Sequence, residues 1–237
     1  LSAAFGGPWV ERRGPRVAAT AAALFFGSGL LIGGAGLLLR QSLLVFLGLG
    51  ITCGIGCGLG YISPVSTLVK WFPDRRGMAT GMAIMGFGGG AFVAGYLNVF
   101  FVERMGVAAT IMTLGVVYVV VMLAGSRLME SPPAGWLPPG WVPSEHTNPM
   151  IASRSVSREA AVRTPQFYLL WGILFINVTA GIGILAQASP MMQDMFGRTP
   201  LEAGAIASLI STCNTGGPSA SASASDYIGR RNTYAVF

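Results

Sequence analysis

The hydrophobic positions of this 237-residue chain fall into long uninterrupted runs, and the charged positions fall into short clusters between them. Each run is at least as long as the roughly 20 residues that an α-helix needs to cross about 30 Å of hydrocarbon. Since a backbone in lipid must close its hydrogen bonds internally, such runs favour helices over barrel strands. The pattern therefore predicts six complete membrane helices. They would occupy the charge-free intervals 17–39, 41–69, 77–102, 105–126, 164–193 and 203–225.

Two shorter apolar stretches lie outside these intervals. One runs from Leu1 to Val10, and the other begins at Tyr234 and reaches Phe237. Neither is long enough to cross a membrane, so we expect both to be parts of helices that are cut at the ends of this chain. The sequence is thus expected to be the middle of a longer protein.

The composition, 52% hydrophobic and 10% charged, agrees with a membrane protein, and the distribution of cations predicts its orientation. Twelve of the 15 Lys and Arg residues fall in loops on one side, against Arg40, Arg104 and Arg198 on the other. Because cation-rich loops are retained in the cytoplasm, the richer side is predicted to be inside. A nucleic-acid surface would need these cations on one face with stacking aromatic residues, so no nucleic-acid partner is expected. The lipid bilayer is the expected environment, in a plasma or inner membrane.

A six-residue pattern occurs twice in the loops of the cation-rich side. The first copy is Glu-Arg-Arg-Gly-Pro-Arg at 11–16, and the second is Asp-Tyr-Ile-Gly-Arg-Arg at 226–231. The acid, the glycine and the last arginine have the same spacing in both copies, as expected for a transporter built from two repeated halves. The pattern resembles the loop signature of the major facilitator superfamily, which lies between helices two and three and again between helices eight and nine. The six helices predicted between the two copies agree with that resemblance.

Further segments are similar to the oxalate/formate antiporter family within that superfamily. They are the stretch 60–90 with its K-W-F-P-D-R-R-G elbow, P-P-A-G-W-L-P-P-G-W at 132–141, R-T-P-Q-F-Y-L-L-W at 163–171 and S-D-Y-I-G-R-R-N-T-Y at 225–234. The resemblance implies an all-α bundle of twelve membrane helices in two pseudo-symmetric halves, monomeric at full length, that carries small organic anions by alternating access. This chain would hold helices three to eight, truncated at both ends.

The same resemblance divides the chain into three parts. Residues 1–127 would belong to the N-terminal half, 128–163 would form a cytoplasmic central loop, and 164–237 would begin the C-terminal half. The loop is rich in proline at its start and in serine and arginine afterwards, which is typical of a linker.

The cytoplasmic loops are expected to form a gate. An acid beside a glycine turn is able to accept hydrogen bonds from the free N–H groups that start the next helix, and arginines are able to pair with acids on neighbouring helix ends. Alternatively, these arginines only anchor the topology. The candidate gating residues are Glu11, Arg12, Arg13, Gly14, Arg16, Asp74, Arg75, Arg76, Asp226, Gly229, Arg230 and Arg231.

Three residues are candidates for substrate binding, because the resemblance places Tyr61, Phe87 and Asn214 at the anion cavity. Each is equally explained as a residue of the helix core or the lipid-facing surface. The family carries a pattern like N-x-x-G-R after Asn214, whose arginine would pair with a carboxylate, but this chain has Pro218 in that place. The Ser-Ala alternation that follows, 219–225, is interpreted as sequence drift or as an artefact of the gene model rather than as part of a cavity.

Other chemistry is nearly absent from the sequence. We expect no catalytic residues, no cofactor and no metal site, since the single histidine, His146, has no partner at ligand spacing. The glycines repeated along 50–60 and 77–95 predict close helix packing, with or without sliding. Three function classes remain: an organic-anion transporter, a non-transporting relic or receptor derived from one, and an intramembrane enzyme. No residue pattern in the sequence supports the enzyme.

Overall fold

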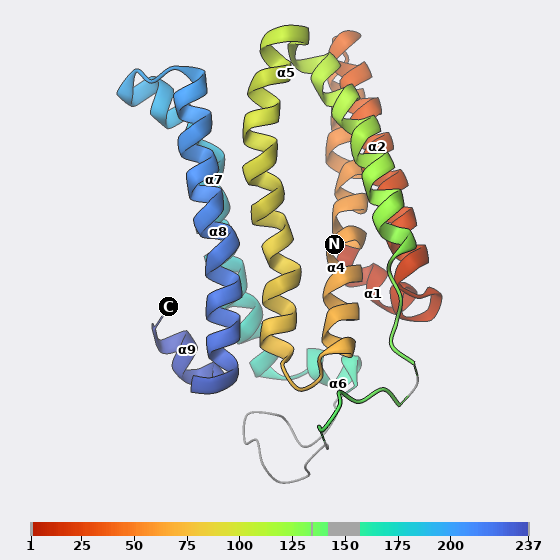
Figure 1. Cartoon of the computed structure of the whole chain (residues 1–237). Helices are drawn as coiled ribbons and strands as arrows, with labels where there is room; N and C mark the ends of the chain where they lie inside the picture. The colour runs from red at the N-terminus through yellow and green to blue at the C-terminus, as the bar shows by residue number, and fades with distance from the viewer. Residues whose placement is uncertain (1, 134, 142–156, 237) are drawn as a thin grey trace.

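The computed structural model describes residues 2–133, 135–141 and 157–236, and each regular element in these ranges is a helix (Figure 1). The long helices lie side by side and alternate in direction. This confirms the all-α class that the hydrophobic pattern predicts. The elements are α1 (Ser2–Arg13), α2 (Pro15–Leu38), α3 (Ser42–Val45), the π-helix η1 (Phe46–Thr52), α4 (Cys53–Trp71), α5 (Arg76–Arg127), α6 (Arg158–Val162), α7 (Pro165–Phe196), α8 (Pro200–Ile228) and α9 (Arg230–Val236).

The charge-free intervals correspond closely to these helices. α2 covers the first interval, α3, η1 and α4 together form one helical segment over the second, and α7 and α8 cover the last two. Four segments are long and apolar enough to cross a membrane: 15–38, 42–71, 76–127 and 165–196. The other long helix, α8, carries serine and alanine where those four carry leucine, isoleucine and valine.

The two helices expected at 77–102 and 105–126 are joined without a loop. Both lie in α5, which bends sharply at Gly106 (φ 77°, ψ 169°), a conformation that glycine adopts at low cost. The chain reverses there at the upper end of the view in Figure 1. Glu103 and Arg104, which interrupt the apolar run, remain helical, and Arg104 lies over the Phe100 ring at 3.5 Å from its centroid. We call 76–105 the first arm of α5 and 107–127 the second arm.

The N-terminal helices pack through their backbones. α2 lies against η1, α4 and the second arm of α5. A β-carbon on Gly48 of η1 would lie 2.7 Å from the carbonyl oxygen of Gly29 on α2, so only glycine fits at this contact. Small residues allow such close approach between membrane helices, where packing has to supply the association energy.

The C-terminal helix α7 is more exposed than the N-terminal helices. α7 packs mainly on α8, and its other face exposes large apolar side chains. Trp171 and Phe175 on that face are stacked, with ring centroids 5.2 Å apart, and both are more than half exposed. An apolar face of this size needs lipid or further helices as its neighbours.

Candidate functional site

The first arm of α5 and α8 form an antiparallel seam of small residues. Gly81, Gly88 and Gly95 recur every seven residues on α5, and they face Ala222, Thr215 and Ser208, which recur every seven residues on α8. A β-carbon on Gly81 would lie 3.0 Å from the Pro218 carbonyl oxygen. The two backbones are therefore in near contact along most of the seam. The spacing of seven is that of helices that pack at a shallow crossing angle.

The serines of α8 have a structural role in this seam. The hydroxyl of Ser219 donates to the carbonyl oxygen of Gly81 at 3.3 Å, and that of Ser208 donates to the carbonyl oxygen of Phe92 at 3.4 Å. The Ser-Ala alternation, interpreted above as sequence drift, therefore supplies short side chains where α5 leaves no room for long ones. Ser219 and Ala222 thus fit the space that the glycine face of α5 leaves.

Asp226 joins the same two helices at the end where α8 finishes and α5 begins. Its two carboxylate oxygens accept hydrogen bonds from the backbone N–H groups of Gly77 at 3.1 Å and Met78 at 3.0 Å, in the first turn of α5. A carboxylate is favourable there, because the first N–H groups of a helix lack intrahelical partners and carry partial positive charge. The sequence predicts a bond to the helix that follows, which is α9, and the structure shows in addition that Asp226 bonds to α5, far earlier in the chain.

The first copy of the repeated pattern is arranged differently. Arg16 pairs with Glu130, just beyond the end of α5, with 2.7 Å between Nη2 and Oε1. Glu11 is exposed at the end of α1, and among the described residues it has no hydrogen bond or ion pair. Asp226 of the second copy thus bonds to the start of another helix, whereas the side chain of Glu11 in the first copy has no such bond among the described residues.

The other candidate gating residues lie at the same end of the bundle. Arg12 and Arg13 are exposed in the last turn of α1, and Gly14 (φ 83°) joins α1 to α2. Asp74 and Arg75 form a loose neighbouring pair, 3.6 Å apart, and Arg76 begins α5. Gly229 (φ 91°) joins α8 to α9, and the side chains of Arg230 and Arg231 lie outside the described residues.

The three candidate binding residues lie on three different helices, α4, α5 and α8. Tyr61 is 39% exposed on α4, and Asn214 is exposed on α8, beside the seam. The side chain of Phe87 lies outside the described residues, as does His146. An open apolar hollow of about 360 Å³ instead lies between the outer ends of α5 and α8, lined by Tyr96, Leu97, Val99, Phe100, Glu103 and Leu201.

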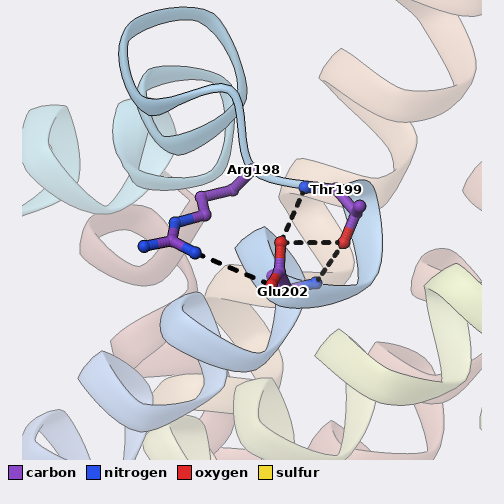
Figure 2. A network of polar contacts seen from close by, with 3 residues as sticks. All are labelled: Arg198, Thr199 and Glu202. Carbon is purple, nitrogen blue, oxygen red and sulfur yellow. Dashed lines mark hydrogen bonds and ion pairs between the residues drawn. The ribbon is translucent and has the colours of Figure 1, made fainter.

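The outer end of α8 begins with a capping box, which Figure 2 shows. The Glu202 carboxylate accepts from the Thr199 backbone N–H at 3.0 Å and from its hydroxyl at 3.1 Å, and the Glu202 N–H donates to that hydroxyl at 3.3 Å. These bonds lower the pKa of Glu202, with a smaller contribution from Arg198, which lies 3.8 Å away. The arrangement satisfies the free N–H groups at this helix start.

A family comparison assigns the fold. A sequence model described as Major Facilitator Superfamily matches residues 1–237. The chain belongs to the major facilitator superfamily. As expected for a member of this superfamily, the helices form a bundle, and their long apolar segments make it an integral, multi-pass membrane protein.

Curated relatives within the superfamily are similar at modest identity. The Uncharacterized MFS-type transporter YhjX of Escherichia coli is 23% identical over 217 residues, 92% of this chain and 51% of the relative. The Oxalate:formate antiporter of Oxalobacter formigenes is 27% identical over 188 residues, 78% of this chain and 41% of the relative. Monocarboxylate transporter 9 of Pongo abelii is 32% identical over 84 residues, 35% of this chain and 16% of the relative. The chain thus spans about half the length, or less, of the curated relatives it matches.

Proposed function

We propose that this protein is a secondary transporter that carries small organic anions across a membrane by alternating access. Membership of a transporter superfamily supports transport in general. The similarity to an Oxalate:formate antiporter and to Monocarboxylate transporter 9 supports a small carboxylate as the substrate. At full length the protein would act as a monomer, in a plasma or inner membrane.

The proposed architecture follows the expected division of the chain. Residues 1–127 belong to the N-terminal half, 128–163 to the central cytoplasmic loop, and 164–237 to the start of the C-terminal half. In this division the seam between α5 and α8 is a contact between the two halves. Its short side chains leave little interdigitation, which allows one half to tilt against the other.

The observation that carries the proposal is the Asp226 contact. It joins α8 of one half to the first turn of α5 of the other, at the end where the cation-rich loops gather. We name this contact the inner gate. While it is made, the inner ends of α5 and α8 are together and the path to the cytoplasm is closed. Its rupture would allow the opposite orientation, as alternating access requires.

The substrate-binding assignment of Tyr61, Phe87 and Asn214 remains part of the proposal. Aromatic rings and an amide suit a small planar carboxylate, but a carboxylate in a low-dielectric cavity also needs a cation. Pro218 stands where the resembling family has arginine. We therefore propose that a cation elsewhere in the full-length protein pairs with the substrate, and that dicarboxylates bind less well than monocarboxylates.

A second candidate function is supported by the same Pro218. A non-transporting relative or receptor derived from a transporter would retain the bundle and the inner gate without the cation that binds anions tightly enough for transport. An enzymatic role finds no support in the names of the relatives, which are transporters.

The test is uptake by the full-length protein in proteoliposomes. Vesicles preloaded with formate, oxalate or pyruvate would be exposed to the labelled anion, with and without an imposed proton gradient. The transporter proposal expects uptake above that of protein-free vesicles, and dependence on preload or on the gradient identifies the coupling. Uptake equal to protein-free vesicles for all three anions would contradict the proposal and favour the non-transporting alternative.

A further inference from the structure

The first part of the central loop is built from two similar tight turns, each ending in a tryptophan. The N–H of Trp136 donates to the carbonyl of Pro133 at 3.1 Å, and the N–H of Trp141 donates to that of Pro138 at 3.1 Å. A glycine with positive φ, Gly135 or Gly140, precedes each tryptophan. The loop therefore carries two indole rings at matched positions of two similar turns.

Among the described residues, Trp136 makes a ring contact and an indole hydrogen bond with the helix bundle, and Trp141 makes neither. The Trp136 ring packs edge-on against Trp71, the last residue of α4, with centroids 5.1 Å apart and planes at 66°. Its Nε1–H donates to the Trp71 carbonyl at 3.2 Å. The Trp71 Nε1–H donates to another residue of the loop, the Glu130 carbonyl, at 2.9 Å. Two indole hydrogen bonds and one ring contact thus join the loop to the end of α4.

Trp71 is separated from the inner gate by one short turn. The elbow after it, 72–75, is closed by the Arg75 N–H, which donates to the Phe72 carbonyl at 3.3 Å, and the Phe72 N–H in turn bonds back to α4. The N–H groups of Gly77 and Met78 follow directly. The direction in which α5 presents them to Asp226 therefore depends on how this elbow is held.

We propose that Trp136 is a positioning residue for the inner gate: by holding Trp71, it orients the elbow so that the first turn of α5 meets the Asp226 carboxylate. The inference rests on the proposed function, because it treats that contact as a gate. It also gives the central loop a role beyond linking the two halves. The start of the loop, as far as Trp136, would then move with the N-terminal half.

The size of the effect follows from the ring contact. Losing an aromatic pair of this kind changes an equilibrium roughly two- to tenfold. Removing the Trp136 ring should therefore raise the fraction of molecules with separated inner ends of α5 and α8 by that factor. The ring of Trp141 makes no such contact with Trp71, so its removal is a matched control in the same segment.

The experiment measures the distance between spin labels on α5 and α8 in the full-length protein. Labels at Met82→Cys and Ala224→Cys, both exposed, would be read by double electron–electron resonance after Cys53, Cys57 and Cys213 are replaced by serine. Trp136→Ala is compared with Trp141→Ala, and Trp136→Phe tests whether the ring alone suffices. Asp226→Asn provides the reference for an opened gate.

The expected result is a larger long-distance fraction in Trp136→Ala, a smaller increase in Trp136→Phe and no change in Trp141→Ala. If Asp226→Asn separates the helices while Trp136→Ala does not, the positioning role is refuted and the gate stands. If Asp226→Asn leaves the distances unchanged, the gate itself is refuted, and the role of Trp136 with it. Equal increases in the two tryptophan-to-alanine variants would indicate a general effect on the loop and would also overturn the proposal.

Discussion

Gly88 on α5 lies directly against the backbone of Thr215 on α8, where a β-carbon on the glycine would come within 2.6 Å of the Thr215 Cα atom. A backbone atom cannot turn away as the end of a side chain can. The contact therefore fixes the distance between two helices that we assign to different halves of the protein.

Gly88→Ala is expected to destabilise the folded protein by about 1–3 kcal/mol, because the added methyl group has to push α8 away. Gly89→Ala is the matched control, since nothing lies within 4 Å of a β-carbon there. That variant should be neutral or slightly more stable, because alanine favours helix over glycine by up to about 1 kcal/mol. Thermal unfolding in detergent would compare the two, and equal midpoints would contradict the close contact.

Asp226→Asn is expected to weaken the inner gate while preserving the size of the side chain. An amide retains one acceptor but loses the charge that favours a helix N-terminus, an effect of about 1 kcal/mol or roughly fivefold in the open fraction. A cysteine at the buried Ser225 would report this as faster reaction with a water-soluble maleimide. Asp194→Asn, at the outer end of α7, should leave the rate unchanged. An unchanged rate in Asp226→Asn would argue against the gate.

The first turn of α8 is expected to loosen in acid. The Thr199 hydrogen bonds lower the pKa of Glu202 in the folded protein, so its carboxylate stabilises this turn fully above the ordinary pKa of a glutamate. That contribution is lost as the pH falls through the lowered pKa. Hydrogen exchange of the backbone amides 200–204, corrected for the intrinsic pH dependence, would show the loss.

Glu202→Gln should abolish this pH dependence, because its amide oxygen still accepts from Thr199 but does not titrate in this range. The same pH profile in the variant and in the wild type would show that another group is responsible.

Glu130→Gln is expected to change stability very little. Arg16 and Glu130 form an ion pair of 2.7 Å, but both side chains are more than half exposed, and such pairs contribute between about 0 and 1 kcal/mol. The bond from Trp71 goes to the backbone carbonyl of Glu130, which the substitution preserves. A loss of thermal stability as large as that of Trp71→Ala would contradict the assignment of the anchoring to the indole rings.

The positions of the helices were predictable because charges are costly in hydrocarbon, so charge-free intervals mark the membrane spans. The two helices predicted at 77–102 and 105–126 are both present, but the turn between them lies at a different residue than the charges suggested. Glu103 and Arg104 suggested a separate turn, but one glycine with positive φ at position 106 is sufficient to reverse the chain. The π-helix at 46–52 was also missed, since its composition does not differ from that of the α-helix that follows.

The α5–α8 seam was not predicted, because its two rows of small residues indicate a contact only once they are placed opposite each other. The glycines spaced by seven on α5 were visible, as were Ser208, Thr215 and Ala222, but the antiparallel register that pairs them comes from the fold. The contact between Trp71 and Trp136 was not predicted, because their positions in an elbow and in a loop carry no signal that they meet. Whether Tyr61, Phe87 and Asn214 bind substrate stays a prediction.

The one-residue turn at Gly106 also bears on where the inner gate lies. The first arm, 76–105, is roughly 45 Å long at 1.5 Å per residue, whereas the hydrocarbon layer is about 30 Å thick. We expect the turn at Gly106 to lie near one membrane surface, so that the opposite end of the first arm reaches beyond the hydrocarbon layer. The contact between Asp226 and the start of α5 is then expected among the headgroups, where salt weakens the attraction between a carboxylate and a helix N-terminus. Raising the salt concentration on that side of a proteoliposome is therefore expected to increase the open fraction of the proposed gate.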